Sequence, residues 1–158
     1  AQQGLWGYIR AHDSMIDEVR GSSYTSDPIA FELDDGDIKE TIRPYIMGRI
    51  VDVEQFFKKY RSDPSADNAK ITFDIEDSFL SWNEKAVTVR FERGECEIVP
   101  EASSHRVKLS IATLTTLLLG YKTAAKLYRM GRIHADEETV RLLDDVLLHE
   151  IPYISDYI

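Results

Sequence analysis

The sequence predicts an α+β protein with one sheet of about five strands, mixed or antiparallel, and helices packed on one face. Three observations carry this prediction: a run of short segments with alternating apolar and polar residues, a later run of capped helical segments, and the order of the two runs. Strands gathered in one run and helices in another are typical of α+β folds.

The first forty residues are expected to lie outside this sheet. Leu5, Tyr8 and Ile9 recur at helical spacing and predict a short helix. Turn-forming residues follow them and separate this helix from the later segments. The predicted strands and the helices that accompany them therefore all lie in residues 41–158.

Five segments are expected to form the sheet. The first is mostly β-branched or apolar, and Pro44 near its start fits an edge or a bulge because proline donates no ladder hydrogen bond. The other four alternate apolar and polar side chains, as half-buried strands do. The predicted strands are residues 41–51, 71–75, 87–91, 95–99 and 106–109.

Each predicted helix begins after a residue whose side chain can cap it. Gly120 and Gly131 are suited to the left-handed conformation that ends many helices, and they follow two of these segments. The predicted helices are residues 53–60 after Asp52, 111–119 after Ser110, 124–130 after Thr123 and 137–148 after Asp136.

Composition excludes several classes of function. A net charge of -9 disfavours a nucleic-acid partner, because phosphate backbones require clustered Lys and Arg. No apolar run approaches the ~18 residues of a membrane span, so we expect no membrane partner. The single cysteine, Cys96, fits a reducing cytoplasm, and the carboxylates beside it disfavour a reactive thiolate. The four histidines lack metal-ligand spacing, so we expect no metal.

Residues 105–133 resemble sterol carrier protein 2 domains. The sequence His-Arg-Val-Lys-Leu-Ser leads into a Leu-rich helix, then Gly120, a second helix, and Gly-Arg-Ile at residues 131–133. In those domains a strand ending in a Leu-Ser step precedes a Leu-rich helix, a glycine, a second helix and a Gly-Arg-(Ile/Leu) turn. The resemblance implies the same fold, in which a lipid can be enclosed in a tunnel beneath the sheet.

Two upstream segments make this resemblance more specific, because they point to one family that contains such a domain. Pro-Tyr-Ile-Met-Gly-Arg-Ile-Val-Asp-Val at residues 44–53 looks like the segment that opens the sterol-carrier-like domain of bacterial Eis-type (enhanced intracellular survival) acetyltransferases of the GNAT family. Residues 5–15 resemble the late helix and turn of the central, degenerate acetyltransferase domain of that family. The resemblance implies that residues 1–40 end the central domain and that residues 41–158 form the C-terminal domain.

The resemblance also implies a role as the accessory part of an enzyme that transfers an acetyl group from acetyl-CoA to an amine. The family holds acetyl-CoA on a Gly-rich loop of its catalytic domain, and this sequence contains no such motif. We therefore expect the isolated chain to be inactive and to bind no acetyl-CoA. The implied partners are the N-terminal GNAT domains of the same protein, an amine substrate and further copies in a cytoplasmic homo-oligomer.

The C-terminal carboxylate of Ile158 is the candidate catalytic group. In the family that it resembles, the carboxylate of the last residue reaches the active site and acts as general base on the amine, a role that chemistry allows a carboxylate. The family often ends in an aromatic residue, whereas this chain ends in isoleucine, and a frayed terminus is the alternative. Tyr157, Asp156 and Trp82 are the candidate substrate-binding residues.

Two other roles stay open beside the accessory role. The first is a lipid-binding module, with a tunnel lined by the strand carrying Val87, Val89 and Phe91 and by the helix around residues 114–118. The second is an oligomerisation module. A filled core would support the accessory role, whereas a continuous apolar tunnel of the ~300–1,000 Å³ typical of ligand sites would support lipid binding.

Overall fold

The computed structural model describes residues 2–23, 31, 38–43, 47–152 and 154, and the chain divides into two units, residues 1–43 and residues 44–158. In the first unit, helix α1 spans Gln2–Arg10 and a 3-10 turn, η1, spans Asp13–Met15. The predicted N-terminal helix is thus confirmed. Leu5 and Tyr8 on α1 are exposed.

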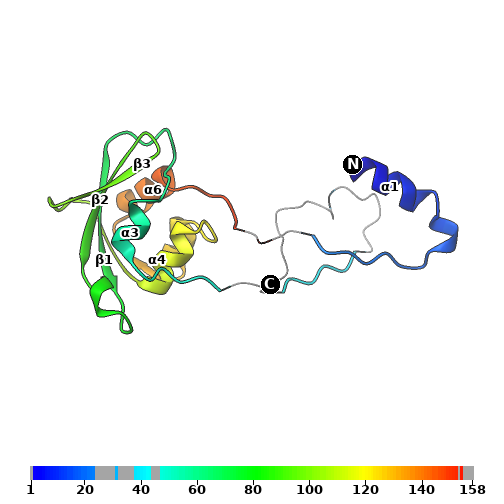
Figure 1. The fold of residues 1–158 in the computed structure, drawn as a ribbon, viewed down its shortest axis with the longest axis horizontal. Coiled ribbons are helices and arrows are strands. Elements are labelled where there is room, and N and C mark those ends of the chain that lie inside the picture. Colours follow the sequence, from blue (N-terminus) through cyan, green and yellow to red (C-terminus); the bar gives the residue numbers. More distant parts are fainter. Residues whose placement is uncertain (1, 24–30, 32–37, 44–46, 153, 155–158) are drawn as a thin grey trace. The chain divides into compact units, whose positions relative to one another are not determined.

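The second unit contains a mixed five-stranded sheet (Figure 1). Its strands are β1 (Ala69–Glu76), β2 (Ala86–Glu92), β3 (Glu95–Val99), β4 (Arg106–Ser110) and β5 (Ile133–His134). The strand order is β3-β2-β1-β4-β5, with β1 and β4 parallel and every other pair antiparallel. The predicted α+β class with a mixed sheet is confirmed.

The alternation in the strand sequences separates the two faces of this sheet. Ile71 and Phe73 of β1 lie opposite Val89 and Val87 of β2, and all four are buried on one face. The other face is polar and carries cross-strand ion pairs. These pairs join Asp74 to Arg106, Glu76 to Lys108 and Arg90 to Glu97. Such pairs stabilise little in water, but they give this face a mainly polar character.

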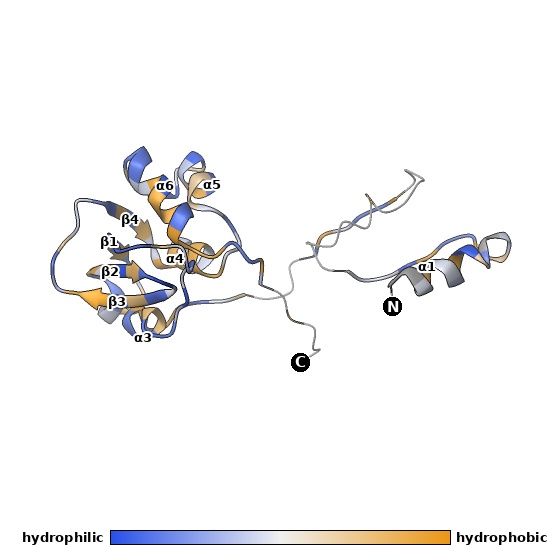
Figure 2. Cartoon of the chain, turned by 90° about the horizontal axis from the view of Figure 1, so that it is seen from above, coloured by the Kyte–Doolittle hydropathy of each residue, from blue (hydrophilic) through white to orange (hydrophobic). Residues whose placement is uncertain are grey.

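Four helices accompany the sheet, and each begins after the predicted cap. Asp52 accepts from the Gln55 amide at 2.9 Å, and Asp136 accepts from the Thr139 amide at 2.6 Å. Figure 2 shows that α5 and α6 each carry hydrophobic and hydrophilic residues, as amphipathic helices do. The helices are α3 (Val53–Phe57), α4 (Ile111–Leu118), α5 (Ala124–Arg129) and α6 (Glu137–Val146), so α3 is shorter than predicted.

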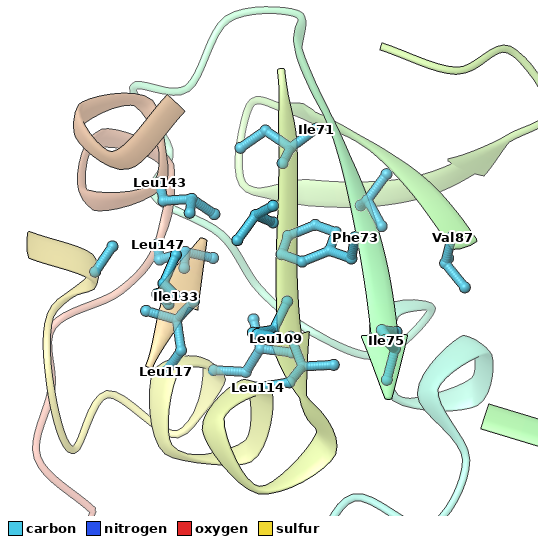
Figure 3. Packing of buried hydrophobic residues seen from close by; sticks show 14 of the residues in the cluster. Ile71, Phe73, Ile75, Val87, Leu109, Leu114, Leu117, Ile133, Leu143 and Leu147 are labelled. Carbon is cyan, nitrogen blue, oxygen red and sulfur yellow. The ribbon is translucent and has the colours of Figure 1, made fainter. Parts of the chain in front are cut away.

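One hydrophobic core joins the apolar face of the sheet to these helices (Figure 3). Phe57 of α3 contacts Phe73 of β1 and Phe91 of β2, with ring centroids 5.2 and 6.5 Å apart. Leu114 of α4 and Leu143 of α6 are buried in the same cluster. The prediction that the helices pack on one face of the sheet is therefore confirmed.

The prediction of a strand over residues 41–51 is wrong for its described residues, 41–43 and 47–51, and residues 44–46 lie outside the described part. The backbone near its end bonds to side chains instead of a neighbouring strand. The Ile50 amide donates to a threonine hydroxyl, and the Val51 carbonyl accepts from two side chains. The fifth strand is β5, a two-residue segment that the sequence analysis assigned to a turn, because two residues show no alternation.

Replacing Phe57 by alanine tests the aromatic core. Phe57→Ala leaves a cavity between α3 and the sheet, and we expect the free energy of unfolding to fall by about 3–5 kcal/mol. Phe79→Ala is the matched control, because the Phe79 ring is exposed and lies beneath the Arg49 guanidinium rather than in the core. We expect it to cost less than about 1 kcal/mol. Urea denaturation of the chain measures both, and equal losses would contradict this assignment of the core.

Candidate functional site

The segment that leads into the sheet domain is held by side chains from distant parts of the chain. The Ile50 amide donates to Thr115 Oγ1 of α4 at 3.2 Å. The Val51 carbonyl accepts from Trp82 Nε1 at 2.8 Å and from Asn83 Nδ2 at 3.1 Å. Because buried backbone groups need partners, these side chains take the place of a neighbouring strand.

Asp77 is the centre of this arrangement. Its side chain is 1% exposed, and it accepts from Arg49 Nη2 at 2.6 Å, from Asn83 Nδ2 at 3.0 Å, and from the amides of Phe79 and Leu80 at 3.0 Å. Burial raises the pKa of Asp77, but these hydrogen bonds together outweigh it and hold the pKa below its usual range. The carboxylate therefore stays ionised and fixes the loop that follows β1.

Asn83 connects Asp77 to the start of α3. It is buried, and its Oδ1 accepts from the Val53 amide at 3.1 Å while its Nδ2 donates to Asp77 and to the Val51 carbonyl. The asparagine lies in the 3-10 turn η2 (Ser81–Asn83), next to Trp82. The indole of Trp82 is consequently held in place through its N–H while 58% of the residue stays exposed.

A hollow of about 290 Å³ lies beside this tryptophan. Lys85 and Glu54, which form an ion pair, both line it. The second carboxylate of the lining belongs to Asp52, which caps α3. Two carboxylates, one ammonium and an indole give the hollow a polar, slightly acidic lining that suits a small cationic group. Its lining residues are Asp52, Glu54, Trp82, Asn83 and Lys85.

The segment that leaves the domain after α6 is anchored separately. Leu147 is buried, and the Leu148 amide donates to the Tyr60 hydroxyl at 3.4 Å. His149 Nε2 lies 2.7 Å from the Asp144 carbonyl, a distance typical of a hydrogen bond. The backbone of the chain is therefore fixed as far as the residues just after α6.

A family model now identifies this architecture. The model for the sterol carrier protein domain matches residues 53–155, which is more than half of the chain. The chain belongs to the sterol carrier protein domain family. A second model, for the acetyltransferase (GNAT) domain, matches residues 1–50, directly before the sterol carrier protein domain. A comparison with curated proteins gave no match.

Solved structures contain both parts in the same order. A probable N-acyltransferase from Enterococcus faecalis V583 is 26% identical over 100% of this chain and 40% of its own, with a TM-score of 0.82. A GCN5-related N-acetyltransferase from Anabaena variabilis ATCC 29413 is 21% identical over 95% of this chain and 38% of its own, with a TM-score of 0.76. This chain thus spans about two fifths of the length of either protein.

Eis1 from Mycobacterium abscessus shares the fold over a smaller region. It is 19% identical over 70% of this chain and 27% of its own, with a TM-score of 0.55. With the two family matches, these neighbours confirm the resemblance to Eis-type acetyltransferases with a sterol carrier protein domain.

The structure describes one of the four residues that the sequence analysis selected for a site. Trp82 lines the hollow and lies in the 3-10 turn η2. Asp156, Tyr157 and Ile158 lie outside the described residues, so their roles stay predictions. Sequence reasoning missed Asp77, although an aspartate directly after an alternating strand is typical of a side chain that bonds to the turn that follows.

The interior of the sterol carrier protein domain is filled where the sequence analysis placed a lipid tunnel. Val89, Phe91 and Leu114 have no exposed surface, and Val87 and Leu118 are 4% and 3% exposed. A tunnel wide enough for a lipid would leave accessible area on these walls. Their burial favours the accessory role over lipid binding by the criterion set above.

Other chemistry is sparse in the described part of the chain. Burial raises the pKa of the Cys96 thiol to about 11 and outweighs the opposing effects of Ser62 and Arg61, which supports a structural thiol. No three His, Cys, Asp or Glu residues among those described lie together as a metal site would require. No described helix is long and apolar enough to cross a membrane.

The Asp77 network predicts a pH-dependent stability difference. In Asp77→Asn, either orientation of the new amide turns an N–H group toward a donor, so we expect a loss of about 1–3 kcal/mol at pH 7. Because the pKa of Asp77 is lowered on folding, its contribution is present above the unfolded value of about 3.9 and is lost as pH falls through the folded value. The difference between wild type and Asp77→Asn should therefore shrink below about pH 4.

Denaturation at several pH values measures this difference. Asp67→Asn, in an exposed loop, is the control and should change stability by less than about 0.5 kcal/mol. A wild-type advantage over Asp77→Asn that is constant down to pH 2 would show that the charge is not what stabilises the loop.

Proposed function

We propose that this chain is the C-terminal accessory part of an N-acetyltransferase that transfers an acetyl group from acetyl-CoA to an amine. The observation that carries the proposal is the pair of family matches, because a GNAT match over residues 1–50 runs directly into the sterol carrier protein match over residues 53–155. The likeness of the whole chain to a probable N-acyltransferase supports it. The N-terminal GNAT domains of the same protein are then its obligatory partner.

The described helices of the sterol carrier protein domain do not fit acetyl-CoA. A pyrophosphate needs free backbone N–H groups at a helix N-terminus, with no competing anion. At α5 the carboxylate of Asp144 already accepts from the Ala124 and Ala125 amides, at 2.6 and 3.0 Å. Carboxylates also cap α3 and α6, and Ser110 caps α4. Acetyl-CoA therefore belongs to the GNAT domains in this proposal.

The isolated chain should accordingly bind no acetyl-CoA. Titration calorimetry of the chain with acetyl-CoA is expected to give no heat of binding at concentrations where the full-length enzyme saturates. The full-length enzyme is the positive control. Micromolar affinity of the isolated chain would contradict this assignment and place a cosubstrate site in the part described above.

The hollow beside Trp82 is proposed to form part of the acceptor pocket. An amine substrate is cationic in water, and the exposed indole and the carboxylates of Asp52 and Glu54 would attract it. Asp156 and Tyr157 are proposed to contribute further contacts from the tail. The amine of Lys85 is engaged in an ion pair with Glu54, which fits a role of the hollow in binding rather than in chemistry.

The carboxylate of Ile158 is proposed to act as the general base. The Glu150 backbone lies against Gly120, and eight residues follow it in the sequence. Fully extended, eight residues span about 26–29 Å, which is ample reach for a neighbouring domain. A free carboxylate within hydrogen-bond distance of the acceptor ammonium can remove its proton before the amine attacks the thioester.

Adding one residue after Ile158 tests this role in a full-length enzyme whose last residue is Ile158. The extension replaces the carboxylate by a neutral amide and moves the new carboxylate by up to ~3.6 Å, so kcat/KM for the amine should fall by ~10²–10⁴. Acetyl-CoA affinity should not change. Ile158→Val, which keeps the carboxylate in place, is the matched control. Equal kinetics for all three proteins would remove Ile158 from the mechanism and leave the domain as a scaffold.

A further inference from the structure

Helix α4 ends in a turn that depends on a glycine. Beyond its last residue, the Gly120 amide donates to the Leu117 carbonyl at 3.0 Å, and the Tyr121 amide donates to the Thr116 carbonyl at 3.1 Å. This pair of bonds is the Schellman arrangement, which requires a left-handed residue at its centre. Gly120 meets that requirement with a φ of +70°.

Gly120 also lies directly beneath the segment that leaves the domain. A Cβ atom added at Gly120 would lie 2.3 Å from the carbonyl oxygen of Glu150 and 3.1 Å from its carbonyl carbon. Contacts this short are not tolerated, and both neighbouring atoms belong to backbone rather than to a flexible side chain. The exit segment therefore lies so close to the end of α4 that only glycine fits at position 120.

The segment that enters the domain touches the same end of α4. A Cβ at Gly48 would lie 3.0 Å from Leu119 Cδ1, and the Ile50 amide bonds to Thr115 Oγ1. In Figure 1 both segments leave the same side of the sheet domain. The helix end itself is firmly held by the core, because α4 buries Leu114, Leu117 and Leu118.

We propose that Gly120 is a positioning residue for the C-terminal tail. The end of α4 fixes the start of the exit segment relative to the entry segment, and thereby sets the point from which the last eight residues extend. This inference rests on the proposed function, in which the carboxylate at the end of that tail is the general base. It adds a residue 38 positions upstream of Ile158 that positions the start of the segment carrying this carboxylate.

The expected effect of a side chain at Gly120 follows from the distances. An ordinary carbon–oxygen contact is about 3.3–3.6 Å, so the Glu150 carbonyl has to move by roughly 1 Å to admit a methyl group. A misplacement of about 1 Å at a reacting group can cost about 10²-fold in rate. The displacement caused by Gly120→Ala falls at Glu150, eight residues before the proposed reacting carboxylate, so we expect this variant to lower kcat for amine acetylation by up to ~10²-fold.

Gly131 provides a matched control within the same domain. It ends α5 in the same arrangement, with its amide bonded to the Tyr128 carbonyl and the Arg132 amide bonded to the Leu127 carbonyl. Its φ is +67°, and a Cβ there would meet nothing within 4 Å. Gly131→Ala therefore carries the same backbone strain as Gly120→Ala without pressing on the tail.

Steady-state kinetics of the full-length enzyme with a diamine acceptor compare the two alanine variants with the one-residue extension after Ile158. We expect Gly120→Ala to lose kcat by up to about 10²-fold, with acetyl-CoA affinity unchanged, and Gly131→Ala to stay within a few-fold of wild type. Thermal unfolding should show a loss of Tm for both variants, larger for Gly120→Ala because it adds the contact with Glu150 to the same backbone strain. If Gly120→Ala fails to fold, Tyr60→Phe is tested in its place. Tyr60→Phe removes the hydrogen bond from the Leu148 amide to the Tyr60 hydroxyl and adds no backbone strain. A selective loss in kcat is again expected.

The outcomes separate the inference from the proposed function. An extension that leaves kcat/KM unchanged overturns the carboxylate mechanism and the positioning role with it. A damaging extension together with equal kcat values for Gly120→Ala and Gly131→Ala overturns the positioning role alone. If Tyr60→Phe is the variant used, a wild-type kcat has the same meaning. A loss that appears only in acetyl-CoA affinity also counts against Gly120 as a positioning residue.

Discussion

The buried carboxylate of Asp77 is the interaction on which the opening of the domain depends. It gathers the Arg49 guanidinium, the Asn83 amide and two backbone amides of its own loop. Once Asn83 is held in this way, its other atoms can satisfy the backbone at Val51 and Val53. A segment with no neighbouring strand is thereby fixed as firmly as a strand in the sheet. Removing one partner would leave several buried polar groups unpaired.

The rest of the site follows from this fixed entry. Because the entry segment is held on one side by the loop after β1, it can pack its other side against the end of α4. The exit segment reaches that same helix end from α6. Two segments that lie a hundred residues apart in sequence therefore share one support, and that support belongs to the hydrophobic core. The core thus controls where the chain enters and leaves the domain.

The local patterns in the sequence were sufficient for most of the fold. Caps such as Asp52 and Asp136 act within three residues, and the alternation in β1 and β2 reports a single buried face, so both are visible along the chain. The prediction of a strand over residues 41–51 failed for its described residues because the apolar side chains there do not form a buried face. Ile42, Met47 and Val51 are exposed, and Ile50 alone among the described apolar residues of this segment is buried. The two-residue strand β5 is too short to show any period.

The site was harder to predict because its contacts join positions that are distant in sequence. Asp77 pairs with Arg49, although Asp52 is the nearer carboxylate in the sequence. Gly120 was visible as a helix stop, because that role depends only on its own φ, while its closeness to Glu150 depends on the path of the chain after α6. Trp82 was selected from the sequence as a candidate binding residue, but the hydrogen bond that orients its indole could not be predicted, because the acceptor is the Val51 carbonyl, 31 residues away.

The distribution of filled and open space favours a role in positioning over a role in storage. The space between the sheet and its helices is occupied by the rings of Phe57, Phe73 and Phe91, which contact one another directly. The precise polar contacts are concentrated instead where the chain enters and leaves. A domain that held an apolar ligand would keep its interior open and would have no need for so rigid a boundary. A filled core that binds the entry and exit segments agrees with the accessory role proposed above, in which the domain presents neighbouring segments of its own chain.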